Sequence, residues 1–162
     1  MNKQYYGDDA VRAAAQYYGF RGPISTIARH VIHEEGFVEG EYDDHKGIPT
    51  FGVGVAREEL KDKNFFTEVL PEYEGQARNA TKGYATLPEE TQAAIVSMAY
   101  RGDWGPKTRG RLNKGDLKGA AKEYLRHGDY KKGKAKNATD AERAVAQRML
   151  RNARALDPDV SA

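Results

Sequence analysis

The 162-residue chain contains no cysteine. Disulfide bonds, thiol catalysis and zinc sites with cysteine ligands are therefore excluded. Long apolar runs are missing too, because residues 93–96 form one of the longest, whereas a membrane-spanning helix needs about 20 apolar residues. The first 22 residues carry five charged side chains and no apolar segment typical of a secretory signal peptide. We therefore expect a protein that is made in the cytoplasm and does not insert stably into a membrane.

A strong excess of one charge is also absent, since 26 Lys and Arg residues are balanced by 24 Asp and Glu residues. Positive charge is nevertheless concentrated in two segments, 101–111 and 131–136. Such segments attract anionic polymers, either nucleic acid or bacterial envelope, but most are simply solvated surface. No nucleic-acid recognition motif accompanies them, so we expect no nucleic-acid partner.

The length and the apolar pattern predict one α+β domain spanning residues 1–162. A β-hairpin is predicted within 37–55, where Phe51, Val53 and Val55 alternate with small or polar residues. About seven helices are predicted in the rest of the chain. Their expected starts are capping residues or capping boxes, namely Asp9, Ser25, Thr86–Glu89, Asp116 and Thr139–Glu142.

Glu35 is the first candidate catalytic residue. It lies four residues after Val31, on the apolar face of a helix that Gly36 is expected to end. Loss of hydration and the negative end of the helix dipole both disfavour a charged carboxylate there. Glu35 therefore has the setting of a general acid, whereas Glu34, about 100° around the helix, does not.

Asp44 is the second candidate, nine residues later in the turn 43–47 of the predicted hairpin. A carboxylate in a polar turn should be solvated and ionised. Two carboxyl groups in contrasting settings are what glycoside hydrolysis uses. Asp is also a common turn residue for local hydrogen bonding, so Asp44 alone decides little.

Thr50 and Gly54 lie on the return strand of the hairpin. The Thr50 hydroxyl could hold a water molecule, and the glycines beside it would leave room for a sugar ring. Each residue has an ordinary structural explanation when taken singly. The ordered string is far more specific: EGFVEGEYDDHKGIPTFGVG over residues 35–54.

This string resembles the lysozymes of tailed bacteriophages, the phage-type muramidases of glycoside hydrolase family 24. The resemblance extends more weakly through segments downstream and covers roughly residues 25–156. It implies a small sheet lobe joined by a long helix to a mostly helical lobe. It also implies a catalytic trio of Glu35, Asp44 and Thr50, which act by inversion on bacterial peptidoglycan.

Further residues match cleft or supporting positions of the family. Tyr100 and Arg101 match cleft-lining positions, Trp104 could stack on a sugar, and Arg143 matches an arginine near the catalytic glutamate. A salt link from Arg143 would hold Glu35 in place. The helix within residues 1–22 has no counterpart in the resemblance, and the sheet is expected to amount to little more than the hairpin.

No cofactor and no metal are expected. His30 and His33 are followed by two glutamates, but the order His-x-x-His-Glu is not that of a metalloprotease helix. Gly52 and Gly54 lack the third glycine and the following helix of a nucleotide-binding loop.

The leading hypothesis is a monomeric muramidase that cleaves the β-1,4 bond between N-acetylmuramic acid and N-acetylglucosamine. Its expected role is host lysis or envelope penetration, with action on the cell wall after release from the host cytoplasm. A lytic transglycosylase is the neighbouring alternative, although Asp44 and Thr50 argue against it. A non-catalytic envelope-binding or virion structural protein that retains the fold is the alternative from another class.

Overall fold

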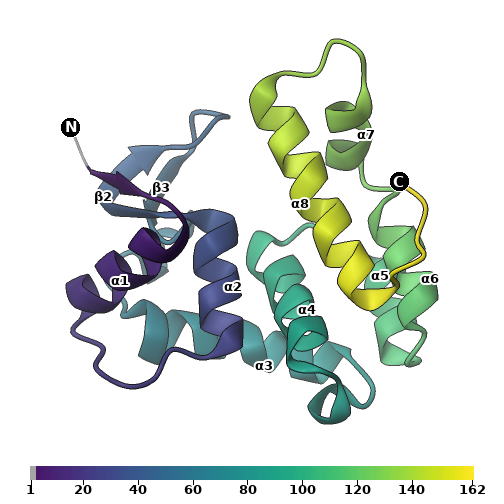
Figure 1. Cartoon of the computed structure of the whole chain (residues 1–162), viewed down its shortest axis with the longest axis horizontal. Helices are drawn as coiled ribbons and strands as arrows, with labels where there is room; N and C mark the ends of the chain where they lie inside the picture. The colour runs from purple at the N-terminus through teal and green to yellow at the C-terminus, as the bar shows by residue number, and fades with distance from the viewer. Residues whose placement is uncertain (1–2) are drawn as a thin grey trace. The chain divides into compact units, whose positions relative to one another are not determined.

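The computed structural model describes residues 3–162, and its chain divides into two compact units, Met1–Tyr73 and Glu74–Ala162 (Figure 1). The division falls inside helix α3 (Leu70–Ala80), so one helix is continuous from the first unit into the second. The first unit contains the sheet and the second contains only helices and turns. The predicted α+β class is confirmed.

The first unit is built on a three-stranded antiparallel sheet in the order β1-β2-β3. The strands are β1 (Gln4–Tyr5), β2 (Phe37–Asp43) and β3 (Pro49–Gly52). The predicted hairpin is β2 and β3, in which Tyr42 is opposite Thr50. The sheet adds only one short strand to this hairpin, because β1 pairs with the start of β2 through Tyr5 and Phe37.

Helices α1 (Gly7–Tyr18) and α2 (Thr26–Glu35) pack on each other beside the sheet (Figure 1). A 3₁₀ turn (Glu58–Leu60) and a π-helix (Phe65–Val69) follow the hairpin and lead into α3. The centre of this unit is apolar, since Ile32, Phe37, Val53 and Phe65 have no exposed surface. Burial of each such side chain contributes roughly 1.5–3 kcal/mol to the free energy of folding.

The second unit surrounds helix α4 (Glu89–Arg101), in which all residues from Ala93 to Tyr100 are buried. After a 3₁₀ turn (Tyr84–Thr86) and α4, the chain forms α5 (Pro106–Asn113), α6 (Leu117–Tyr124), α7 (Gly128–Lys134) and α8 (Asp140–Leu156). Helix α8 packs on α4, α6 and α7 (Figure 1). Residues 93–100 therefore form the centre of this unit.

Three of the expected helix starts are confirmed. Ser25 accepts a hydrogen bond from the Ala28 N–H, Asp116 accepts one from Gly119, and Thr139 forms a full capping box with Glu142. Each such cap stabilises its helix by about 1 kcal/mol, because it satisfies an N–H that has no partner within the helix.

Two expected starts were wrong. Helix α1 begins at Gly7, so Asp9 lies inside its first turn and does not cap it. The Thr86 hydroxyl donates to the Gly83 carbonyl within the 3₁₀ turn, and α4 begins after Pro88. Local hydrogen bonding of a threonine in a turn competes with capping, and here the turn prevails.

Candidate active site

Glu35 is the last residue of α2, immediately before the residue that ends the helix. Gly36 has φ = +71° and its N–H donates to the Ile32 carbonyl at 2.7 Å. A φ in this range is accessible to glycine at little cost, so Gly36 turns the chain directly from the helix into β2. The Glu35 side chain is half-buried at this junction.

The backbone of Gly54 packs against the Glu35 side chain. A Cβ atom placed on Gly54 would lie 3.2 Å from Glu35 Cβ, Cδ and Oε2. Gly54 also has φ = +61°, which favours glycine for a second, independent reason. The last glycine of the sequence string therefore defines one wall of the space that the Glu35 carboxyl group occupies.

Tyr42 is close to both candidate carboxylates. Burial, followed by the negative charges of Glu35 and Asp44, raises the pKa of Tyr42 to about 12. A hydrogen bond from the Gly54 N–H to the Tyr42 hydroxyl opposes part of this shift. Tyr42 thus connects the helix end, the hairpin turn and the glycine that packs on Glu35.

Asp44 organises the hairpin turn with its backbone and one carboxylate oxygen. Its Oδ1 accepts hydrogen bonds from the N–H groups of Lys46 (2.8 Å) and Ile48 (2.9 Å), and its own N–H donates to the Ile48 carbonyl (3.0 Å). The carboxylate is therefore held in one orientation by the turn. The described contacts use Oδ1, and Oδ2 remains for another hydrogen-bonding partner.

Thr50 is buried on β3, with 4% of its surface exposed. Its hydroxyl donates to the Ile48 carbonyl at 2.9 Å, across the same turn that holds Asp44. Because the hydroxyl proton is used in this bond, Thr50 can offer only an acceptor lone pair to a further group. Asp44 and Thr50 are thus tied to the same residue, Ile48.

The glycine between these residues is also closely packed. A Cβ atom placed on Gly52 would lie 2.6 Å from the Tyr18 hydroxyl oxygen, and Gly52 has φ = +54°. Tyr18 is the last residue of α1, and burial raises its pKa to about 12. The N-terminal helix therefore touches the strand that carries Thr50, a relationship that the sequence analysis did not identify.

The model of the family Phage lysozyme matches residues 32–148 of the chain. The match covers the helix end, the hairpin and most of the helical unit. The chain belongs to the phage lysozyme family. No curated protein and no solved structure matches it. Membership of this family supports lysozyme-type, peptidoglycan-lytic activity.

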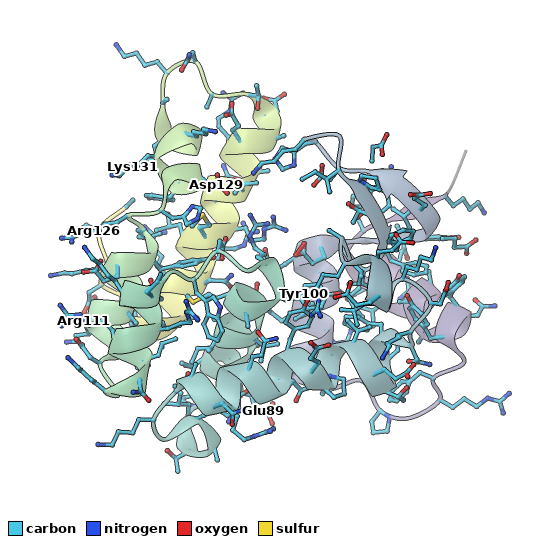
Figure 2. All side chains as sticks on the ribbon, turned by 180° about the vertical axis from the view of Figure 1, so that it is seen from behind. Glu89, Tyr100, Arg111, Arg126, Asp129 and Lys131 are labelled. Atoms are coloured by element: carbon cyan, nitrogen blue, oxygen red, sulfur yellow. The ribbon has the colours of Figure 1, made fainter. Side chains whose placement is uncertain are left out.

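The second unit of this lysozyme-family chain contains the predicted substrate-binding side chains. Tyr100 and Trp104 are each only 9% exposed, so most of each ring packs in the protein interior. Figure 2 labels Tyr100 at its place on α4. Their contact with substrate stays a prediction.

Arg101 has a clear structural partner. Its Nε donates to Asp103 Oδ2 at 2.8 Å, and the two side chains are 14% and 5% exposed. The Tyr124 hydroxyl donates to the other oxygen of Asp103 at 2.8 Å. Arg101 therefore compensates a buried carboxylate, which is a stabilising task independent of any substrate.

Arg143, the predicted support for Glu35, lies in the first turn of α8. Its guanidinium donates to the Ala138 carbonyl and pairs with Asp140. These contacts reinforce the start of its own helix, where acidic residues and caps are favourable. The predicted link to Glu35 stays a prediction.

Some of the positive charge of the second unit is neutralised by ion pairs. Figure 2 shows Arg111, Arg126 and Lys131 on the same side of this unit. Arg111 pairs with Asp116 at 3.1 Å and Arg126 with Glu123 at 3.4 Å. Over residues 3–162, no group of three or more His, Asp or Glu side chains is placed to hold a metal ion, and no helix is long and apolar enough to cross a membrane.

Proposed function

We propose that the chain is an inverting muramidase that hydrolyses the β-1,4 bond between N-acetylmuramic acid and N-acetylglucosamine. One observation supports this proposal above the others: Tyr42 is affected by the charges of both Glu35 and Asp44. The two carboxyl groups therefore share one neighbourhood, although they come from a helix end and a hairpin turn. An inverting glycosidase needs a separation of roughly 6.5–9.5 Å between them, so that a water molecule fits.

Glu35 is proposed as the general acid. It is half-buried, the C-terminal end of α2 places partial negative charge beside it, and Gly54 restricts its side chain. In this role the Glu35 carboxyl group donates its proton to the glycosidic oxygen as the C–O bond breaks. The leaving sugar then departs as a neutral alcohol.

Asp44 and Thr50 are proposed to hold the attacking water. Asp44 Oδ2 would accept one proton of the water, while the Thr50 hydroxyl, whose own proton is used on Ile48, would accept a hydrogen bond from the other. The oxygen lone pair of the water then faces the anomeric carbon. Rigid placement of both acceptors by the hairpin turn favours this arrangement over a freely moving water.

The proposed reaction is balanced in atoms and protons. The water oxygen forms a bond to the anomeric carbon, Asp44 takes the proton released by the water, and the bond to the leaving oxygen breaks. Glu35 ends the cycle ionised and Asp44 ends it protonated. Exchange of protons with solvent restores both groups.

The test is mass spectrometry of the fragments that the protein releases from purified peptidoglycan, followed in isotopically labelled water. We expect hydrated reducing ends that carry the label at the anomeric carbon, and ¹H NMR of the first products, before mutarotation, should show the inverted configuration. Glu35→Gln should reduce release by a factor of about 10²–10⁴, the usual contribution of general acid catalysis. Glu34→Gln is the matched control, because the neighbouring glutamate points elsewhere on the same helix and should leave activity unchanged.

Other products would assign other functions. Anhydro-sugar ends would mean that the enzyme is a lytic transglycosylase. A lack of release by the unaltered protein from several wall types would leave a binding or structural role. For the biological role, we propose lysis of the host or penetration of its envelope, with peptidoglycan as the target.

A further inference from the structure

Tyr6 is the most exposed large hydrophobic side chain in the part of the chain that the structure describes. Its surface is 70% exposed, compared with 55% for Tyr17 and 44% for Ile48. It follows β1, in a segment that precedes the family match at residues 32–148. A single exposed aromatic side chain is common on protein surfaces, so the contacts and the position of Tyr6 decide whether it can bind a ligand.

The exposed ring has contacts that restrict its movement. The Tyr6 hydroxyl donates to Gln4 Oε1 at 2.6 Å. One edge of the ring lies against Gly36, with Cδ1 and Cε1 3.6 and 3.7 Å from a Cβ atom placed there. The preceding residue, Tyr5, pairs with Phe37 in the sheet. A ring that is already ordered loses little conformational entropy when it binds a ligand.

The position of the ring is next to the proposed catalytic residues. Gly36, which it contacts, directly follows Glu35 in the chain. The charge of Tyr6 is also one of the causes that raise the pKa of Tyr42, together with the charges of Glu35 and Asp44. Tyr6, Tyr42 and the carboxyl pair are therefore near neighbours within the first unit.

We propose that Tyr6 forms a sugar subsite, in which its exposed ring stacks on one hexosamine ring of the glycan strand beside the cleaved bond. The C–H groups on one face of a pyranose are weakly positive and complement the negative face of an aromatic ring. Gln4 holds the Tyr6 hydroxyl, whose oxygen can still accept a hydrogen bond from a sugar hydroxyl or amide. This proposal rests on the proposed muramidase function, because it assumes that the glycan passes Glu35.

The kinetic test compares Tyr6→Ala, Tyr6→Phe and Tyr6→Trp on glycan strands of defined and increasing length, prepared from peptidoglycan. For strands long enough to reach Tyr6, we expect Tyr6→Ala to raise KM about 5- to 10-fold, the factor that one aromatic contact provides, with little change in kcat. The shortest cleavable strands should show no difference. Tyr6→Phe and Tyr6→Trp keep a stacking surface and should retain most of the affinity.

Tyr17→Ala is the matched control, because Tyr17 is an exposed tyrosine of the same segment whose ring packs on Tyr18 and Phe37 instead. It should change thermal stability more than KM. Binding of the same strands to Glu35→Gln protein, with and without Tyr6→Ala, gives a second readout that needs no turnover. If the protein binds glycan strands through Tyr6 but does not hydrolyse them, the muramidase proposal fails while the subsite proposal stands. The binding measurement therefore distinguishes failure of one proposal from failure of the other.

Three results would overturn the subsite. The first is an unchanged KM and unchanged binding at every strand length after Tyr6→Ala. The second is an equal loss with Tyr6→Phe, which would assign the effect to the bond with Gln4. The third is a fall in kcat and in stability at all lengths alike, which would make Tyr6 a structural support for Gly36.

Discussion

Gly54 and Glu35 are in direct contact, 19 positions apart in the sequence, so that the glycine backbone borders the carboxyl group of the proposed acid. The contact explains why a side chain is excluded at residue 54. It also means that the position of the Glu35 carboxyl group can be altered without replacing Glu35 itself.

Gly54→Ala should therefore reduce activity while the protein remains folded. The new methyl group would lie 3.2 Å from Glu35 Oε2 and would displace the carboxyl group by a few tenths of an ångström or more. The left-handed φ of +61° adds about 1–2 kcal/mol of strain. We expect at least a tenfold loss of kcat/KM, measured on peptidoglycan beside the free energy of unfolding.

Gly19→Ala provides the control for backbone strain. Gly19 has φ = +66°, but a Cβ atom placed on it has no neighbour within 4 Å. Gly19→Ala should lower the free energy of unfolding by about as much as Gly54→Ala does, and it should keep full activity. Equal activity of the two variants would show that the contact with Glu35 is not important for catalysis.

Tyr18 and Gly52 should be energetically coupled. Gly52→Ala places a methyl group 2.6 Å from the Tyr18 hydroxyl oxygen, whereas the next nearest atoms are 3.8 and 3.9 Å away. Tyr18→Phe removes that oxygen, so Gly52→Ala should be less destabilising in the Tyr18→Phe background. Strain from the left-handed backbone is the same in both backgrounds and cancels in the comparison.

Urea denaturation of the four proteins in this cycle measures the coupling free energy. We expect about 0.5–3 kcal/mol, the range found for residues in contact. If the effects of Gly52→Ala and Tyr18→Phe on the free energy of unfolding simply add, β3 can move away from α1 without loss of stability. In that case the N-terminal helix would not define the position of β3.

Alkaline conditions should destabilise the fold between pH 10 and 12. The pKa of Tyr18 and of Tyr42 is raised from 10.0 to about 12 in the folded chain, chiefly by burial. The folded state therefore holds these protons more tightly than the unfolded state. The stabilisation is complete below pH 10 and is lost as the pH rises toward 12.

Denaturant titrations across this pH range, with phenolate absorbance in parallel, test the linkage. Tyr42→Phe removes one of the linked protons, so its unfolding free energy should fall less steeply with pH than that of the unaltered protein. Identical slopes for both proteins would indicate that Tyr42 is solvated in the folded state.

Arg101→Ala should be strongly destabilising. It removes the cation from Asp103, whose side chain is only 5% exposed, and an uncompensated buried carboxylate typically costs about 3–5 kcal/mol. Arg12→Ala is the matched comparison, because Arg12 and its partner Asp9 are 71% and 73% exposed. That change should cost at most about 1 kcal/mol.

Thermal and chemical denaturation of both variants distinguishes two roles of Arg101. A folded, stable Arg101→Ala protein with weakened glycan binding would support the substrate-binding role predicted from the family resemblance. A large loss of stability would assign Arg101 to the support of Asp103.

Local signals in the sequence predicted much of the fold. Ser25, Asp116 and Thr139 cap helices because each places a side-chain oxygen within reach of N–H groups two or three residues later. Gly36 ends α2 for a similarly local reason, its left-handed φ. Residues 35–54 were placed correctly on a helix end and a hairpin, since both elements are specified by neighbouring residues.

Contacts between distant residues were not predictable in the same way. Gln4 and Tyr5 form a strand of two residues, too short for any periodicity, and they pair with residues more than 30 positions away. The contact of Tyr18 with Gly52 likewise has no local signal. Tyr42 did carry a local signal, because it lies in the family-like string 35–54, but its neighbours became clear only from the folded hairpin.

The pairing of β1 with β2 has a practical consequence for protein engineering. The family match begins at residue 32, in the middle of α2, whereas the sheet next to Glu35 includes residues 4 and 5. A chimera joined at the start of the match would divide α2 and leave the edge of β2 unpaired, which invites strand pairing with other chains. A graft that exchanges this unit between relatives should therefore carry β1 together with α2, β2 and β3.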